Sequence, residues 1–302
     1  MVWSYNRIAR CTYRTTGRHL GSAGGRAADE PERGAAEKCT TCGGRKTLRR
    51  TCEFLDHAGP IPIAHRGGMG EGEEFGFDTI ERAVAMGCYI EMDVSATTEG
   101  IPILWHPQGF DRLRPRRSVD VGAEGLRISD PSSDRRSGEA VVYRLDDILG
   151  SNSGMHALID VKKWSAVMPV ARAIAATKAV HRVSIGTFSQ ARTDATAQKI
   201  FSLTGEQACT ALGPAMLAKL AVRALVDPHG PWDARGHIAQ PPYRLVTEQF
   251  IAAAHRAGLA VFPWTVNSGK EMNRVLDMGA DGVMTDFPSQ LVKILASRSG
   301  RN

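Results

Sequence analysis

The chain has 302 residues, a length that suits one large α/β domain or two small ones. Its formal net charge is +6, but residues 1–50 hold 11 basic against 4 acidic residues, so the rest of the chain is close to neutral. The absence of excess positive charge in residues 51–302 argues against nucleic acid as a partner. Since no apolar run approaches 18 residues, we expect no transmembrane segment and a cytoplasmic protein.

Residues 1–58 form a basic extension rich in Gly and Arg, without sustained helical or strand periodicity, and we expect it to be disordered. Its first 27 residues contain arginine but no acid, as mitochondrial targeting peptides do, and lack the apolar core of a secretory signal. Cys39, Cys42 and Cys52 form an incomplete set of zinc ligands, so incidental thiols are the favoured interpretation. Cys88 and Cys209 lie in apolar runs, which predicts reduced cysteines in the core.

Residues 59–298 read as one domain, in which short apolar runs alternate with helix-like segments. The expected strands are residues 61–65, 89–94, 101–106, 156–161, 183–188, 207–212, 259–266 and 282–285, with room for a ninth short strand at 236–240. Helix-like segments between them include residues 79–86, 166–177, 215–225, 247–257 and 270–278.

This alternation predicts a mostly parallel sheet, and eight strands in this length fit a closed (β/α)₈ TIM barrel better than an open sheet. Residues 108–140 are rich in Arg, Asp, Ser and Gly and have no periodicity. We expect them to be an insertion after the third strand, on the face where barrel loops build active sites.

Polar residues recur at the carboxyl ends of the first four expected strands. They are His65 and Arg66 on the first, Glu91 and Asp93 on the second, His106 on the third, and Asp160 and Lys162 on the fourth. Residues two apart in a strand point to the same face, so the two pairs converge if both point inward. A single strand-end histidine or a single Glu-x-Asp pair is usually structural, but their joint occurrence on four successive strands favours chemistry.

Three carboxylates in one place are costly unless a cation neutralises them. Oxygen ligands from Glu91, Asp93 and Asp160 predict one hard divalent cation, Mg²⁺ or Ca²⁺. With Arg66 and Lys162 nearby, such a site suits a phosphate group. Two histidines on neighbouring strands then provide an acid and a base near neutral pH.

Several motifs in this order resemble the glycerophosphodiester phosphodiesterase family. They are Ile-Ala-His-Arg-Gly-Gly at 63–68, Ile-Glu-Met-Asp-Val at 90–94, the strand 101–106, Leu-Ile-Asp-Val-Lys at 158–162, Thr-Phe at 187–188, Trp-Thr-Val-Asn at 264–267 and Asp-Gly-Val-Met-Thr-Asp at 281–286. The resemblance runs from about residue 61 to 293. It covers residues 108–140 only vaguely and has no counterpart for the extension.

The resemblance implies a TIM barrel that hydrolyses glycerophosphodiesters to glycerol 3-phosphate and an alcohol. Carried over by position, it makes His65 and His106 the acid/base pair. It makes Glu91, Asp93 and Asp160 the ligands of the divalent cation, and it assigns Arg66 and Lys162 to phosphate oxygens. Trp264 then lines the apolar side of the pocket. We expect the glycerol 2-hydroxyl to attack phosphorus, giving a cyclic phosphate that water opens.

The chain departs from the family pattern at three motifs. Glu74 is kept, in a supporting role, but Phe75 and Gly76 replace its usual Asn-Thr neighbours; Pro107 stands where an Asp follows the second histidine; and Asp160 replaces a Glu. Two alternatives therefore stay open. One is a lysophospholipase D or sphingomyelinase D-like enzyme on the same barrel, acting on a lysophospholipid. The other is a non-catalytic barrel that binds phosphorylated ligands.

Overall fold

The computed structural model describes residues 52–106, 127–129, 141–227 and 234–300. Most of the predicted insertion at 108–140 and all of the extension before residue 52, with Cys39 and Cys42, lie outside the described residues.

Eight parallel strands carry the fold. They are β1 (Ile61–Ala64), β2 (Tyr89–Ala96), β6 (Ala157–Val161), β7 (Val183–Gly186), β8 (Cys209–Thr210), β9 (Ile238–Ala239), β10 (Ala260–Val261) and β11 (Gly282–Thr285). Hydrogen bonds join β11, β1, β2, β6, β7 and β8 in that order, and β9 pairs with β10.

Backbone hydrogen bonds close the ring at the two remaining seams. A bridge joins Ala211 to Ile238, next to β8 and β9, and the Asp281 amide donates to the Val261 carbonyl between β10 and β11. The predicted (β/α)₈ barrel is therefore confirmed. Because strands are joined edge to edge all round, the described barrel strands leave no open edge for another chain.

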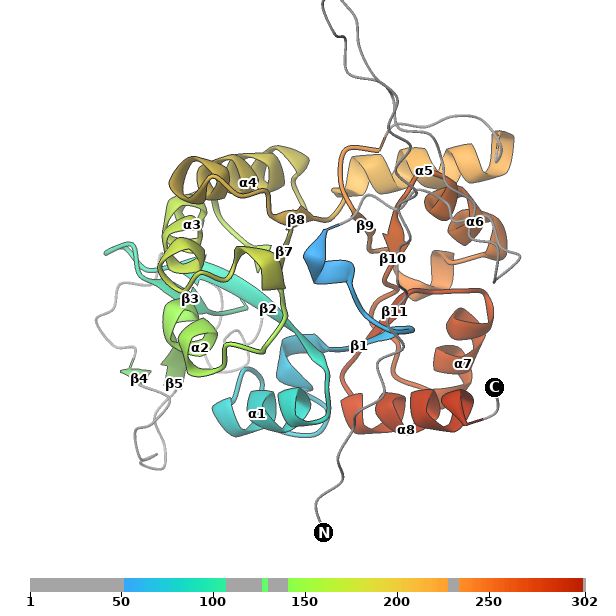
Figure 1. Ribbon diagram of the computed structural model, residues 1–302, viewed down its shortest axis with the longest axis horizontal. Helices are drawn as coiled ribbons and strands as arrows, with labels where there is room; N and C mark the ends of the chain where they lie inside the picture. Colours follow the sequence, from blue (N-terminus) through green and yellow to red (C-terminus); the bar gives the residue numbers. More distant parts are fainter. Residues whose placement is uncertain (1–51, 107–126, 130–140, 228–233, 301–302) are drawn as a thin grey trace, which may run out of the picture. The chain divides into compact units, whose positions relative to one another are not determined.

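Each barrel strand is followed by a helix within the described residues, and Figure 1 shows these helices outside the strands. They are α1 (Phe77–Ala85), α2 (Leu145–Ser151), α3 (Val167–Ala176), α4 (Gln190–Thr204), α5 (Pro214–Val226), α6 (Glu248–Arg256), α7 (Gly269–Asp277) and α8 (Pro288–Ser299). Local signals start several of them. Proline stands in the first turn of α5 and α8, and the hydroxyl of Ser268 accepts from the Glu271 amide to cap α7.

The prediction of a third barrel strand at residues 101–106 is wrong. Residues 101–106 contain β3 (Pro102–Leu104), which pairs antiparallel with the outer end of β2. The link between β2 and β3 is a short turn in which the Thr97 amide donates to the Ile101 carbonyl. Such a turn can only reverse the chain, since a parallel crossover needs a dozen or more residues. The ninth candidate at 236–240 is the missing barrel strand, β9.

Residues 52–55, assigned from the sequence to the extension, pack under the barrel through Cys52, Phe54 and Leu55. Phe54 belongs to the short 3₁₀ helix η1 (Glu53–Leu55), and only 1% of it is exposed. It packs with the first residues of several strands, among them Ile61, Tyr89 and Cys209. Phe54 therefore fills the amino end of the barrel, opposite the end to which the loops after the strands belong.

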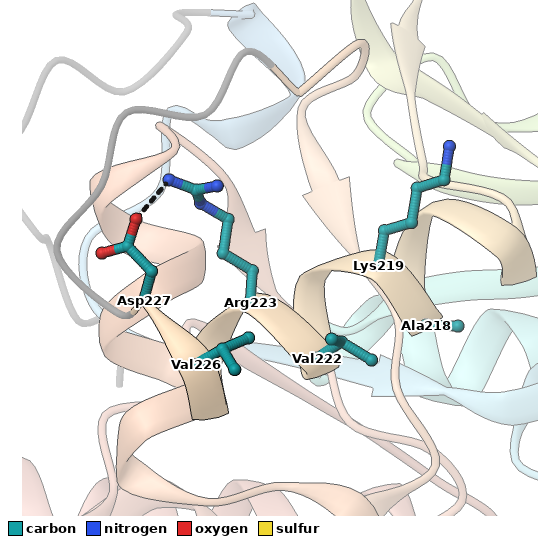
Figure 2. A pocket seen from close by; sticks show the side chains of 6 residues that line it. All are labelled: Ala218, Lys219, Val222, Arg223, Val226 and Asp227. Carbon is teal, nitrogen blue, oxygen red and sulfur yellow. Dashed lines mark hydrogen bonds and ion pairs between the residues drawn. The ribbon is translucent and has the colours of Figure 1, made fainter.

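A shallow groove lies on the outer face of α5. It is lined by Ala218, Lys219, Val222, Arg223, Val226 and Asp227, and Figure 2 shows Arg223 turned toward Asp227. Their Nη2 and Oδ2 atoms are 3.0 Å apart. The groove is separate from the strand ends that carry the predicted site. In the part of the chain that the structure describes, every helix falls short of the length and hydropathy needed to cross a membrane.

Candidate active site

The carboxyl end of β1 turns sharply to present His65 and Arg66. Both belong to the 3₁₀ helix η2 (His65–Gly67), in which Arg66 has a positive φ of 50°. Gly67 and Gly68 follow with φ of 82° and 98°. A Cβ on Gly68 would lie 2.7 Å from a carbon of Pro288, so side chains are excluded from the turn. The Gly-Gly pair therefore lets His65 face the barrel mouth while the backbone packs against α8.

His65 is held by a carboxylate from the last strand. Its Nδ1 lies 2.6 Å from Oδ1 of Asp286, which follows β11. Asn267 donates from Nδ2 to the other oxygen of Asp286 at 2.6 Å, and its own Oδ1 accepts from the Asp286 amide at 3.0 Å. With both carboxylate oxygens acting as acceptors, His65 donates from Nδ1. Its Nε2, 3.9 Å from Glu91 Oε2, is the atom left for substrate chemistry.

Asp93 and Asp160 are neighbours across the β2–β6 ladder, and two cations lie between and beside them. Lys162 Nζ contacts Asp93 Oδ1 and lies 2.6 Å from Asp160 Oδ2. Arg66 Nε lies 3.0 Å from Asp93 Oδ2. Burial alone lowers the pKa of Lys162, but Asp160 and Asp93 outweigh it and raise that pKa. Lys162 therefore carries a positive charge in the site.

Glu91 lies two residues before Asp93, on the same face of β2 and deeper in the barrel. Its Oε2 accepts from the Arg66 amide at 3.1 Å. Burial, followed by repulsion from Asp93, raises the pKa of Glu91 to about 7. Glu74 lies at the rim, where its Oε1 accepts from Arg66 Nη1 at 2.6 Å. Four carboxylates, Glu74, Glu91, Asp93 and Asp160, thus surround the two cations Arg66 and Lys162.

His106 reaches the same cluster from the antiparallel β3 arm. Its Nε2 lies 4.0 Å from Asp93 Oδ2, and the Trp105 amide donates to the Asp93 carbonyl at 2.9 Å, which ties the arm to β2. Burial lowers the pKa of His106, and Arg66 and Lys162 act in the same direction against the opposing effect of Asp93. His65 behaves oppositely. Burial lowers its pKa, but the Asp286 hydrogen bond and the charge of Glu91 raise it overall.

A pair of aromatic rings lies beside the charged cluster. Phe188, just after β7, lies 5.5 Å from Lys162 Nζ and 6.0 Å, edge-on, from the ring of Trp264. Trp264 is fixed by a 2.8 Å hydrogen bond from its indole to the Gln240 carbonyl. Trp264, predicted to line the apolar side of the pocket, therefore contacts the charged cluster through Phe188. All nine predicted site residues lie at one end of the barrel.

The donor set of the cluster fits a hard divalent cation. Four carboxylates against two cations leave two negative charges uncompensated when all are ionised, which is the charge that such an ion supplies. Asp160 Oδ1 is buried and accepts no hydrogen bond from the described residues. Asp93 Oδ2 also lacks a hydrogen bond, but it is ion-paired with Arg66 Nε at 3.0 Å. The side chains are not gathered around one point, since the described residues contain no group of three His, Cys, Asp or Glu in a metal-binding arrangement.

The site also includes residues to which the sequence analysis gave no role. Asp286 and Asn267 orient His65, and Phe188 links Lys162 to Trp264. Asp286 and Phe188 follow β11 and β7, as His65 follows β1. The rule that polar and aromatic residues at carboxyl ends of strands build the site therefore extends to these two positions.

Known proteins share the sequence pattern and the fold of this chain. Residues 65–290 match the model of the glycerophosphoryl diester phosphodiesterase family. The chain is 32% identical over 265 residues to the Mycobacterium tuberculosis protein named "Probable glycerophosphodiester phosphodiesterase 2", covering 82% of this chain and 95% of that one. It is 24% identical over 250 residues to the glycerophosphodiester phosphodiesterase of Caldanaerobacter subterraneus, covering 78% and 97%.

Two solved structures share the fold. The glycerophosphodiester phosphodiesterase of Agrobacterium tumefaciens superposes with a TM-score of 0.60 at 19% identity, covering 78% of this chain and 99% of that one. A phosphodiesterase of Oleispira antarctica, solved with the product sn-glycerol-3-phosphate, superposes with a TM-score of 0.59 at 17% identity, covering 79% and 97%.

Fold and site together define a barrel enzyme that acts on phosphoric diesters. The chain belongs to the glycerophosphoryl diester phosphodiesterase family.

Proposed function

We propose that this enzyme hydrolyses glycerophosphodiesters to glycerol 3-phosphate and an alcohol, with His65 and His106 as the acid/base pair. The main support is that two partly buried histidines face one carboxylate pair on β2, with Lys162 and Arg66 beside it. The two cations attract an anionic diester. A phosphodiester bound to both cations would lie within reach of each histidine.

The surroundings of the two histidines give them different roles. Asp286 accepts from His65 Nδ1 and stabilises the imidazolium, so His65 is suited to hold a proton at Nε2 and donate it to the leaving alcohol. His106 lies near Arg66 and Lys162, which favour its neutral form. It is suited to accept the proton of the attacking glycerol 2-hydroxyl. The roles exchange when water opens the cyclic phosphate.

We also propose that Glu91, Asp93 and Asp160 hold one divalent cation, Mg²⁺ or Ca²⁺. Asp160 Oδ1, which is buried and accepts no hydrogen bond from the described residues, and the excess negative charge support this. When bound, the cation supplies positive charge that polarises a phosphoryl oxygen. Arg66 and Lys162 stabilise charge on the remaining phosphoryl oxygens. Glu74 keeps Arg66 extended toward Asp93 through its 2.6 Å ion pair.

The test of the acid/base pair is alanine substitution with a surface histidine as control. His65→Ala and His106→Ala should each reduce kcat for glycerophosphocholine by about 10²–10⁴-fold. His181→Ala, at an exposed histidine in the 3₁₀ helix η4 (Val180–Arg182), should leave kcat unchanged. Wild-type turnover in both site variants would refute the assignment. EDTA treatment followed by re-addition of Mg²⁺ or Ca²⁺ tests the cation, because undiminished activity after chelation removes it from the scheme.

A second candidate, cleavage of lysophospholipids, is favoured by one observation. Phe188 is 61% exposed and Trp164, two residues beyond Lys162, is 58% exposed. Exposed aromatic rings beside a phosphate site suit an acyl chain better than a small polar alcohol. Comparing kcat/KM for lysophosphatidylcholine and glycerophosphocholine separates the candidates. In a lysophospholipase D, Phe188→Ala should reduce kcat/KM for the lysolipid selectively, whereas equal losses would argue for the small substrate.

A further inference from the structure

Two cysteines far apart in the sequence meet at the amino end of the barrel. Cys52 precedes η1, and Cys209 is the first residue of β8, 157 positions later. Their Sγ atoms are 2.7 Å apart. Both are reduced in the structure. A disulfide has an S–S distance of about 2.05 Å, so small rotations of the side chains suffice to join them.

The surroundings of the pair give the two thiols different reactivity in thiol–disulfide exchange. The hydrogen bond between the two sulfurs lowers the pKa of Cys52 against the opposing effect of burial, and backbone hydrogen bonds near Leu55 and Phe54 add to it. Cys209 is only 2% exposed, and burial raises its pKa. Cys52 is half-buried and open to a reagent from solution. The more accessible thiol thus carries the greater thiolate character.

We propose that Cys52 and Cys209 form a reversible disulfide that locks η1 onto the base of the barrel. The oxidant is a low-molecular-weight disulfide such as oxidised glutathione. The Cys52 thiolate attacks one glutathione sulfur and releases one glutathione thiolate. Cys209 then loses its proton and attacks the Cys52 sulfur, forming the Sγ–Sγ bond and releasing the second glutathione. Two cysteine thiols are oxidised, one glutathione disulfide is reduced, and both protons pass to glutathione.

The expected consequence is thermal stabilisation. The bond closes a loop that spans most of the barrel, and a cross-link over so long a loop removes much entropy from the unfolded chain. It also holds Phe54 in its buried position between the strands. The melting temperature of the oxidised chain should exceed that of the reduced chain by about 5–10 °C.

The experiment treats the full-length folded chain with oxidised glutathione, blocks free thiols and digests without reduction. Trypsin cuts after Arg45 and Arg50, so the peptide holding Cys52 is separate from the one holding Cys39 and Cys42. We expect a linked Cys52–Cys209 peptide with two hydrogens lost, together with the rise in melting temperature. A link from Cys52 to Cys39 or Cys42, or glutathione retained on Cys52, overturns the proposal.

Three variants make the test specific. Cys52→Ser and Cys209→Ser should each abolish the linked peptide and the oxidant-dependent rise in melting temperature. If the buried substitution at Cys209 prevents folding, the half-buried one at Cys52 still decides. Cys88→Ser is the matched control at a buried cysteine packed in the core, and it should keep both effects. A rise that survives Cys52→Ser contradicts the lock.

Discussion

The substitution Asp286→Asn tests how the barrel orients His65, the proposed proton donor. Asn267 cannot turn its amide over, because its Oδ1 accepts from the Asp286 amide at 3.0 Å and from Thr285 Oγ1 at 3.3 Å. Its Nδ2 must therefore donate to position 286. An asparagine there must accept from Asn267 and so presents its own NH₂ to His65 Nδ1. His65 is then left with its proton on Nε2 in the neutral form, and the imidazolium loses its charged partner.

The magnitude follows from the same substitution in a Ser-His-Asp triad, where the wrong tautomer reduces kcat by about 10⁴-fold. Because Asp286 is partly exposed to solvent, we expect a loss of about 10²–10⁴-fold in kcat for glycerophosphocholine. KM should change little, since neither Lys162 nor Arg66 is touched. Release of glycerol 3-phosphate, followed with a coupled enzyme, gives both parameters.

The chain contains a matched control in a second histidine–aspartate pair at the opposite end of the barrel. His255 Nε2 lies 2.7 Å from Asp281 Oδ2, just before β11. Asp281→Asn should cost about 1–3 kcal/mol of unfolding free energy and leave kcat unchanged. If Asp286→Asn keeps kcat within about threefold of wild type, as its control does, the assigned role of Asp286 is refuted.

Three further substitutions probe the fold. Phe54→Ala should lower the free energy of unfolding in urea by about 3–5 kcal/mol, because it leaves a cavity at the base of the barrel. Glu53→Ala, at the exposed neighbour, should lower it by less than about 0.5 kcal/mol. Equal effects would exclude Phe54 from the core. Burial raises the pKa of Tyr89 to about 12, so the unfolded chain releases this proton first and stability falls as pH rises from about 10 toward 12. Tyr89→Phe should remove up to about 1.4 kcal/mol per pH unit of that fall, and parallel urea-unfolding profiles of the two proteins from pH 9 to about 11.5 would count against it. Asp227→Asn breaks the surface ion pair of the α5 groove and should change stability by less than about 0.5 kcal/mol and kcat not at all; a loss of activity would give the groove a function.

Much of the barrel and of the site could be predicted, because both depend on local patterns. Alternating strands and helices predict a parallel barrel, and the spacing of Glu91 and Asp93 places both on one face of β2. The β9 strand was only a weak candidate because its ladder is two residues long, and its place is decided by its neighbours β8 and β10. Apolar periodicity could not distinguish the antiparallel β3 from a barrel strand. The shortness of the turn before it could have done so.

The residues that sequence reasoning missed act through distant contacts. Asp286 meets His65 only because β11 pairs with β1 across a separation of 221 positions. Phe54 lies in a segment without periodicity, and only the tertiary structure shows that the barrel has room for one aromatic ring at its base. The position of Asp286 after β11 is a local signal that it belongs to the site, but neither its pairing with His65 nor the burial of Phe54 can be read from the local sequence.

The two histidines differ in how they come to be in place during folding. His106 is carried to Asp93 by the β2–β3 arm, whose contacts are close in sequence and therefore form early at small entropic cost. His65 finds Asp286 only when the first and last strands of the barrel meet. Recovery of catalytic activity during refolding should therefore follow closure of the β1–β11 seam, and turnover measures the last step of assembly.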